Sequence, residues 1–266
     1  DYNPQAQATT VEDSATPQPA KPAASPPVDD VPEIGKLQSG NAVEAPPLAE
    51  ATPPTSQPIL VTTDVLRVEI DPRGGSLVSA ELLAYPQQQG SSEPVRLLDD
   101  EAARYFVAQS GLLSSDGAAP NHQAEFTTSS RNWTLANGQN RIEVPLTWQD
   151  ASGIQVRKTL VFERGSYVIG MQQQVRNASA KPWTGQAYRQ LQRIPLVLDS
   201  SGIKGYTNTE RYSFMGAAWY SPEEKFQKLA FDKFQGEPLK HTVSGGWVAM
   251  LQHYFFAAWI PPPGET

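Results

Sequence analysis

The stretch that decides the fold is Ile154-Gln-Val-Arg-Lys-Thr-Leu-Val-Phe162, Glu163-Arg-Gly-Ser166 and Tyr167-Val-Ile-Gly-Met-Gln-Gln-Gln-Val-Arg176. Two short runs rich in β-branched and apolar residues flank a turn-forming segment, which is typical of a β-hairpin. Similar runs precede it at 133–135 and 142–148, and polar turn segments recur about every 10–15 residues. The stretch therefore predicts an antiparallel meander, and Pro145 within one run predicts an edge strand or a bulge.

The chain on the N-terminal side of the meander continues the strand pattern. Leu66, Val68 and Ile70 fall on one face of a strand over 65–70. The segment 71–75 reads as a turn, because proline fixes one φ angle and glycine supplies a positive one. Residues 76–83 resume the strand. Further strands are expected at 95–98, 105–109 and 183–191, and a polar loop is expected at 111–130.

The C-terminal third contains a nearly continuous apolar run over 247–260. At 14 residues this run is too short to span a bilayer, so it predicts one or two buried strands. Helix signals are scarce. Ser221-Pro-Glu-Glu224 has the pattern of a helix start, and Phe226, Leu229 and Ala230 would share one helical face. This predicts a helical turn or two at 221–230, with an extended conformation as the alternative.

Residues 1–58 differ in composition from the rest of the chain. They hold 12 of the 24 prolines, eight acidic and two basic residues, and Tyr2 as their one aromatic residue. Such a segment buries too little apolar surface to offset its ordering entropy, so we expect a disordered, acidic linker rich in proline and alanine. Residues 59–266 carry 20 acidic and 19 basic residues. A domain this close to neutral is not expected to bind nucleic acid.

The ends and the cysteine content set further limits. The absence of cysteine excludes disulfides and cysteine-based sites. The sequence contains no run of 18 apolar residues, so it predicts no membrane-spanning helix. The sequence begins without methionine and stops just after an apolar run, so we expect a fragment of a longer protein, truncated at the C-terminus of a β-domain covering 59–266.

The sequence contains no recognisable catalytic constellation. His122 lies in a polar loop and His241 beside Lys240, so both are expected to be exposed, and His253 in an apolar strand is expected to be structural. No two histidines have the i, i+4 spacing of a helical zinc site. The sequence predicts a protein that is not an enzyme, with no catalytic, metal-binding or cofactor-binding residue and no small-molecule substrate.

An aromatic cluster offers two interpretations. It comprises Tyr206, Tyr212, Phe214, Trp219, Tyr220, Phe226, Phe231 and Phe234. Most of these rings are expected to fill the core, but some could form a partner surface, since tyrosine and tryptophan are enriched at interfaces. Tyr212, Trp219 and Tyr220 are the candidate partner-binding residues. Turn residues flank Trp219 and Tyr220, and residues beside turns tend to be exposed.

Two blocks resemble a known family. Phe214-Met-Gly-Ala-Ala-Trp-Tyr-Ser-Pro-Glu-Glu-Lys-Phe-Gln-Lys228 and Gly245-Gly-Trp-Val-Ala-Met-Leu-Gln-His-Tyr-Phe-Phe-Ala-Ala-Trp-Ile-Pro261 are similar to the first periplasmic domain in the YidC branch of the YidC/Oxa/Alb membrane insertases. Thr63-Asp-Val-Leu66, Arg73-Gly-Gly75 and Ala84-Tyr-Pro86 resemble the start of that domain.

The resemblance implies an all-β fold, a β-supersandwich like that of galactose mutarotase with little helix. It implies a periplasmic domain of a multi-pass protein in the bacterial inner membrane, which integrates and folds membrane proteins alone or with the Sec translocon. The implied partners are the accessory subunits SecF and SecD and the translocating membrane proteins. The insertion groove of the family lies in a membrane core outside this sequence.

A second class of function stays open from the fold alone. Mutarotase-like sandwiches also host sugar-processing enzymes and carbohydrate-binding proteins, and a fold does not fix a function. A mutarotase needs a carboxylate base and a histidine acid facing one cleft. No histidine in this sequence has a convincing local partner, which favours the scaffold over the carbohydrate-binding or mutarotase-like alternative.

Overall fold

The stretch 154–176 forms two adjacent strands of a three-stranded antiparallel sheet in the computed structural model. The structure describes residues 57–195, 214–234, 236, 240–252 and 254–265. The sheet consists of β7 (Arg141–Gln149), β8 (Ile154–Glu163) and β9 (Ile169–Asn177), in the order β7-β8-β9. The predicted meander is confirmed. Pro145 lies in the edge strand β7, opposite Thr159 of β8. An edge position suits proline because it has no backbone N–H to donate to a second neighbouring strand.

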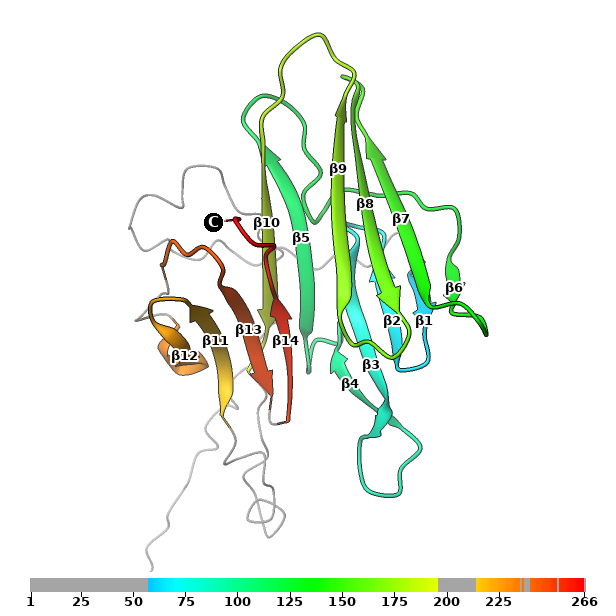
Figure 1. Cartoon of the computed structure of the whole chain (residues 1–266), viewed down its shortest axis with the longest axis vertical. Helices are drawn as coiled ribbons and strands as arrows, with labels where there is room; N and C mark the ends of the chain where they lie inside the picture. Colours follow the sequence, from blue (N-terminus) through cyan, green and yellow to red (C-terminus); the bar gives the residue numbers. More distant parts are fainter. Residues whose placement is uncertain (1–56, 196–213, 235, 237–239, 253, 266) are drawn as a thin grey trace, which may run out of the picture.

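A seven-stranded sheet forms the second layer (Figure 1). Its order is β10-β5-β3-β2-β1-β6, with β4 also pairing with β3, and β1 pairs with β6 in parallel. The strands are β1 (Ile59–Thr62), β2 (Leu66–Asp71), β3 (Ser76–Pro86), β4 (Pro94–Leu98), β5 (Phe106–Ser114), β6 (Asn132–Thr134) and β10 (Gly185–Arg193). Every strand predicted from the sequence in this part is present.

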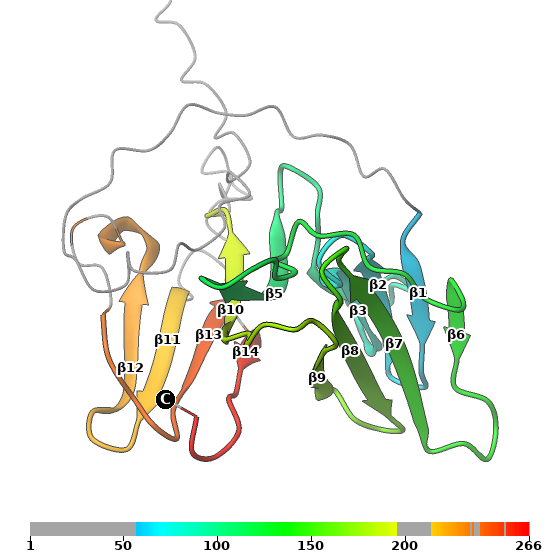
Figure 2. The same cartoon turned by 90° about the horizontal axis from the view of Figure 1, so that it is seen from above.

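The core lies between these two sheets. Figure 2 shows β7 and β8 lying against the part of the larger sheet formed by β1, β2 and β3. The predicted inward face of β2 is confirmed, since Leu66, Val68 and Ile70 are all buried. They share one apolar cluster with residues of the opposing sheet, among them Leu146 and Phe162. Each Å² of apolar surface that such a cluster buries stabilises the fold by about 25 cal/mol.

The turn between β2 and β3 packs closely under the loop that follows β5. Gly74 has a φ angle of +76° and donates its N–H to Ala124 O at 2.8 Å. A Cβ atom there would come within 2.3 Å of the carbonyl oxygen of His122. Glycine is therefore required at this position both for the backbone angle and for the close approach.

A third sheet of four strands stands beside the sandwich. Its order is β12-β11-β13-β14, built from β11 (Met215–Ser221), β12 (Lys225–Ala230), β13 (Trp247–Gln252) and β14 (Phe255–Trp259). The helical turns predicted at 221–230 are wrong, because Ser221–Glu224 is the turn of the β11–β12 hairpin. The hydroxyl Oγ of Ser221 accepts the N–H of Glu224 at 2.9 Å, so the residues of a helix N-cap here close a tight turn instead.

The apolar run 247–260 forms two strands as predicted, but the prediction that they are buried is wrong for several residues. Ala249 is buried, whereas Val248, Phe256 and Ile260 are exposed. The third sheet contacts the core cluster through β13 and β14. The side chains that pack against the cluster are Met250, Phe255, Ala257 and Trp259. The opposite face of the sheet has no strand layer covering it among the described residues.

The third sheet is fastened to the second layer through β10. Arg193 donates to Leu251 O at 3.2 Å and to Gln252 Oε1 at 2.7 Å, and its guanidinium lies 4.8 Å from the Phe106 ring centre. Burial lowers the pKa of Arg193 to about 10, so the side chain remains charged at neutral pH. Trp259 Nε1 donates to Gln190 O at 3.0 Å. These bonds join strands about 60–70 residues apart in the chain.

The all-β sandwich prediction is confirmed. Within the described part of the chain the helical content is one 3-10 turn, Phe231–Lys233. The linker predicted over 1–58 lies outside the described residues except for its last two.

Candidate functional site

The predicted partner-binding residues lie on the β11–β12 hairpin, except Tyr212, which lies outside the described residues. The register places Trp219 opposite Gln227 and Tyr220 opposite Phe226. Adjacent residues of a strand point to opposite faces of the sheet. The structure therefore separates Trp219 from Tyr220, and these two rings do not form one surface.

Trp219 lies on the face that continues toward the core. Its neighbour across β13 is Val248, which in turn pairs with Trp259. Its Nε1 lies 3.5 Å from Glu224 Oε2, and its ring centre is 6.1 Å from that of His241. Trp219 is half-buried and held at the tip of the hairpin by these contacts.

Tyr220 lies on the opposite face and stacks with Trp247. Their ring centres are 6.2 Å apart with an angle of 12° between the planes, and Phe226 lies 6.0 Å from Trp247. We call Tyr220, Phe226 and Trp247 the hairpin aromatic patch. Lys228 adds a cation over the Phe226 ring at 5.6 Å.

The patch does not fill the core. Phe226 is 48% exposed, and Tyr220 and Trp247 are half-buried. The expectation that most of the aromatic cluster fills the core is wrong for its described members, since every one of them is half-buried or exposed. These members are Phe214, Trp219, Tyr220, Phe226, Phe231 and Phe234. Sequence reasoning missed Phe226 and Trp247 as neighbours of Tyr220. The turn residues Ser221 and Glu224 could have placed Phe226 by register, but the pairing with Trp247 has no local signal.

The prediction that His122 is exposed is wrong. It is buried, its backbone N–H donates to the Tyr188 hydroxyl at 2.8 Å, and its Nδ1 lies 2.7 Å from the same oxygen. The loop that carries it is polar in composition, but the hydroxyl of Tyr188 on β10 holds both the backbone and the ring of His122. This arrangement fixes the loop against β10 and is structural.

His241 is exposed as predicted, but it has a carboxylate partner that the sequence did not indicate. Its Nδ1 lies 3.0 Å from Glu224 Oε2. Both side chains are on the surface, so the pair lacks the enclosing cleft that acid–base catalysis requires. His253 lies outside the described residues.

Lys158 of β8 is buried between the sheets. Its Nζ donates to Gly74 O at 2.5 Å, to Ser110 O at 3.0 Å and to Ser110 Oγ at 2.9 Å. Burial lowers the pKa of Lys158 to about 7. Three acceptors from β5 and the β2–β3 turn thus hold one amine, which makes the residue a cross-link between layers and leaves it closed to substrate.

A shallow groove of about 390 Å³ runs between β9 and β10. Met171, Gln173 and Val175 form one wall, and the small residues Gly185 and Ala187 leave room at its floor. No group of three or more histidine, aspartate or glutamate side chains that could hold a metal occurs in the described part of the chain.

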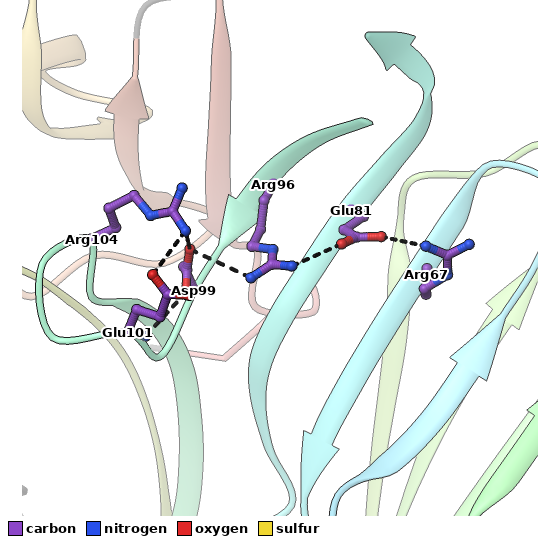
Figure 3. A network of polar contacts seen from close by, with 6 residues as sticks. All are labelled: Arg67, Glu81, Arg96, Asp99, Glu101 and Arg104. Carbon is purple, nitrogen blue, oxygen red and sulfur yellow. Dashed lines mark hydrogen bonds and ion pairs between the residues drawn. The ribbon is translucent and has the colours of Figure 1, made fainter. Parts of the chain in front are cut away.

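A chain of alternating charges crosses the larger sheet (Figure 3). Glu81 lies between Arg67, at 2.8 Å, and Arg96, at 3.1 Å. The buried Asp99 pairs with Arg104 at 3.1 Å and lies 3.9 Å from Arg96. With Glu101 the network holds three guanidinium groups and three carboxylates, so its charges balance and it offers no excess of either sign to a ligand.

The comparisons with known proteins agree with one another. The family model described as YidC periplasmic domain matches residues 58–266. The chain is 41% identical to the membrane protein insertase YidC of Stenotrophomonas maltophilia (strain K279a), an alignment covering 82% of this chain and 38% of that protein. It is 38% identical to YidC of Xanthomonas campestris pv. campestris (strain 8004), covering 97% of this chain and 45% of that protein.

A third relative is YidC of Thioalkalivibrio sulfidiphilus (strain HL-EbGR7), at 40% identity over 88% of this chain and 41% of that protein. The chain thus spans less than half the length of these curated relatives. No helix in the described residues is long and apolar enough to cross a membrane. Since the family model covers the whole β-domain, from just before β1 to residue 266, the chain belongs to the family of YidC periplasmic domains.

Proposed function

We propose that the chain is the periplasmic domain of a bacterial inner-membrane insertase and acts there as a non-catalytic scaffold. The longer protein integrates and folds membrane proteins, alone or with the Sec translocon. The observation that carries this proposal is the match of residues 58–266 to the YidC periplasmic domain, with relatives named as membrane protein insertases. The carbohydrate-binding alternative is not favoured by these relatives.

A non-catalytic role is supported by the way the polar side chains are used. Lys158 and His122 hold layers and loops together inside the fold. The pair His241–Glu224 is exposed at the hairpin tip. We expect that His241→Gln combined with Glu224→Gln leaves membrane-protein insertion by the longer protein unchanged. Loss of insertion in a variant that still folds would reveal a catalytic pair.

The proposed partner surface is the hairpin aromatic patch, and the proposed partner is an accessory subunit of the translocon, SecF or SecD. The patch combines an exposed phenylalanine with two stacked rings, and the neighbouring cation of Lys228 lies over the Phe226 ring. A near-neutral domain has little electrostatic steering available, so affinity would come from a few aromatic anchors.

The test compares two faces of one hairpin in the longer protein. Phe226→Ala is expected to weaken co-purification with SecF about tenfold or more, since truncated anchors typically cost about 2 kcal/mol. Trp219→Ala is the matched control, because Trp219 neighbours the patch in sequence but lies on the opposite face. Thermal unfolding of both variants checks the fold. The docking surface lies elsewhere if Trp219→Ala weakens co-purification while Phe226→Ala does not.

The acidic segment 1–58 is proposed to be a flexible tether. A flexible chain of this length has an end-to-end distance of roughly 40 Å, which its prolines would extend. Its net negative charge would keep it off anionic lipid headgroups. Rapid amide exchange throughout the segment is expected, and strong protection over any ten consecutive residues would contradict the tether.

A further inference from the structure

Three rings from three sheets meet at one end of the molecule. Tyr85 is the penultimate residue of β3, Tyr167 lies just before β9, and Phe255 begins β14. The Tyr85 ring centre lies 5.9 Å from that of Tyr167 and 5.5 Å from that of Phe255. Figure 1 shows the end of β3 and the beginnings of β9 and β14 at the same lower end of the domain.

These rings form part of an exposed apolar surface. Tyr254 is 80% exposed, Val168 71%, Tyr85 45% and Tyr167 42%. We call Tyr85, Tyr167, Val168, Tyr254 and Phe255 the tip patch. Val168 and Tyr254 lie in the connections that precede β9 and β14, so the most exposed members protrude from turns. Tyr85 contacts the rings of Tyr167 and Phe255, and Val168 and Tyr254 are the chain neighbours of these two residues. Exposed apolar side chains gathered in this way mark interaction sites.

The cations beside the tip patch already have partners: Arg193 donates to Leu251 O and to Gln252, the register partner of Phe255. The turn that leads to Tyr167 contains Glu163 and Arg164, and Asp64 accepts the N–H of Gly165 at 3.0 Å. The guanidinium of Arg164 is occupied, since it donates to Ala136 O at 2.9 Å and Gln139 O at 3.0 Å. Attraction to anionic groups is therefore weak here.

We propose that the tip patch inserts into the headgroup region of a lipid bilayer and so sets how the domain stands on the membrane. Tyrosine suits this region because its ring is apolar and its hydroxyl remains hydrated, and three of the five members are tyrosines. Protruding turns can enter a lipid interface without a complementary partner surface. The weak attraction to anionic groups fits zwitterionic lipid. The inference rests on the proposed function, because it needs a membrane beside the domain.

The test uses the absence of cysteine from the chain, which makes single-site labelling specific. Val168→Cys carries an environment-sensitive dye, and Ile260→Cys is the matched control. Ile260 is 67% exposed but follows the opposite end of β14. With phosphatidylcholine vesicles, we expect a blue-shifted, brighter emission at position 168 that lipid-borne spin labels quench, and no change at position 260. The signal should persist in 500 mM salt.

A second pair of variants measures the energetic role of the patch. Val168→Asp combined with Tyr254→Asp is expected to lower partition into the vesicles about tenfold, because two apolar contacts are replaced by charges. Ile260→Asp should leave partition unchanged, and circular dichroism verifies that both variants fold. The proposal is overturned by an unresponsive dye at 168, by binding that requires anionic lipid and disappears in salt, or by an equal loss with Ile260→Asp. A protein-docking role would give the first outcome. Co-purification with SecF reports on the hairpin aromatic patch, so the two proposals fail separately.

Discussion

Lys158 places an amine inside the sandwich, where it donates to two backbone carbonyls and one hydroxyl. Its pKa is about 7 in the folded chain against 10.5 for the ordinary side chain. Between these values the unfolded chain binds more protons than the folded one, so the free energy of unfolding rises with pH. Below pH 7 the amine is charged in both states and this contribution to stability is absent.

Lys158→Met should remove that dependence. Between pH 7 and pH 10 the unaltered chain is expected to gain a few kcal/mol of stability relative to the variant, at about 1.4 kcal/mol per pH unit. The variant also loses donors to Gly74 and Ser110, which costs about 1–3 kcal/mol at every pH. Urea unfolding of both chains across this range measures the difference. Parallel pH profiles would show that the amine keeps its ordinary pKa.

Gly74 provides a second test at the scale of single residues. Gly74→Ala is expected to destabilise the domain by about 3 kcal/mol or more, because its Cβ would overlap the His122 backbone. Gly90→Ala is the matched control, since Gly90 has a similar φ angle of +82° but open space around it. That control should cost only about 1 kcal/mol. Equal losses, measured by thermal unfolding, would mean that backbone angle and not packing sets the requirement.

The β11–β12 hairpin carries an identifiable strain. Lys225 has a φ angle of +59°, the one positive value at a residue other than glycine in the described chain. Lys225→Gly should therefore stabilise the domain by up to about 1 kcal/mol. Lys228→Gly, three residues along β12, should destabilise it, because glycine weakens strands and two cation–ring contacts are lost. A destabilised Lys225→Gly variant would show that the bond from Lys225 Nζ to Pro222 O outweighs the strain.

Elements whose information is local could be predicted from the sequence. The alternation of Leu66, Val68 and Ile70 identified both the strand β2 and its buried face. Hydrophobic alternation and turn residues indicate the conformation of the residues next to them in the chain. The β7–β9 meander could be predicted because each of its strands pairs with the next one along the chain.

Features that depend on distant partners could not be predicted. Ser221-Pro-Glu-Glu224 suits a helix start or a hairpin turn, and the pairing of β11 with β13 decides between them. The burial of His122 depends on Tyr188, 66 residues away. The placement of the candidate site residues is of the same kind, because Trp219 and Tyr220 are adjacent in sequence but point to opposite faces of β11, a strand that the sequence pattern had not identified.

Across the whole molecule, Arg193 is the main polar connection between the third sheet and the sandwich. We expect Arg193→Met to accelerate amide exchange in β13 and β14 while leaving β1 to β3 protected, because the lost bonds reach Leu251 and Gln252. Arg67→Met removes an exposed ion pair with Glu81 and should have a small effect on either region. Uniform loss of protection in Arg193→Met would mean that the three sheets unfold as one unit.

The pairing of β5 with β10 also has a consequence for how the chain folds as it is synthesised. Phe106 pairs with Arg193 and Ser114 with Gly185, so this ladder joins segments separated by about 70–90 residues. Loops of this length make pairing slow, and β5 waits with one edge unpaired while the β7–β9 meander forms between them. A nascent chain halted before Gly185 is expected to self-associate through the unpaired edge of β5, and the chain extended past Trp259, in which β10 covers β5 and β14 lies beside β10, is not, which sedimentation of stalled chains would detect. During synthesis the chain is therefore prone to aggregate for a limited period, which ends once β10 has paired with β5 and the third sheet has formed beside it.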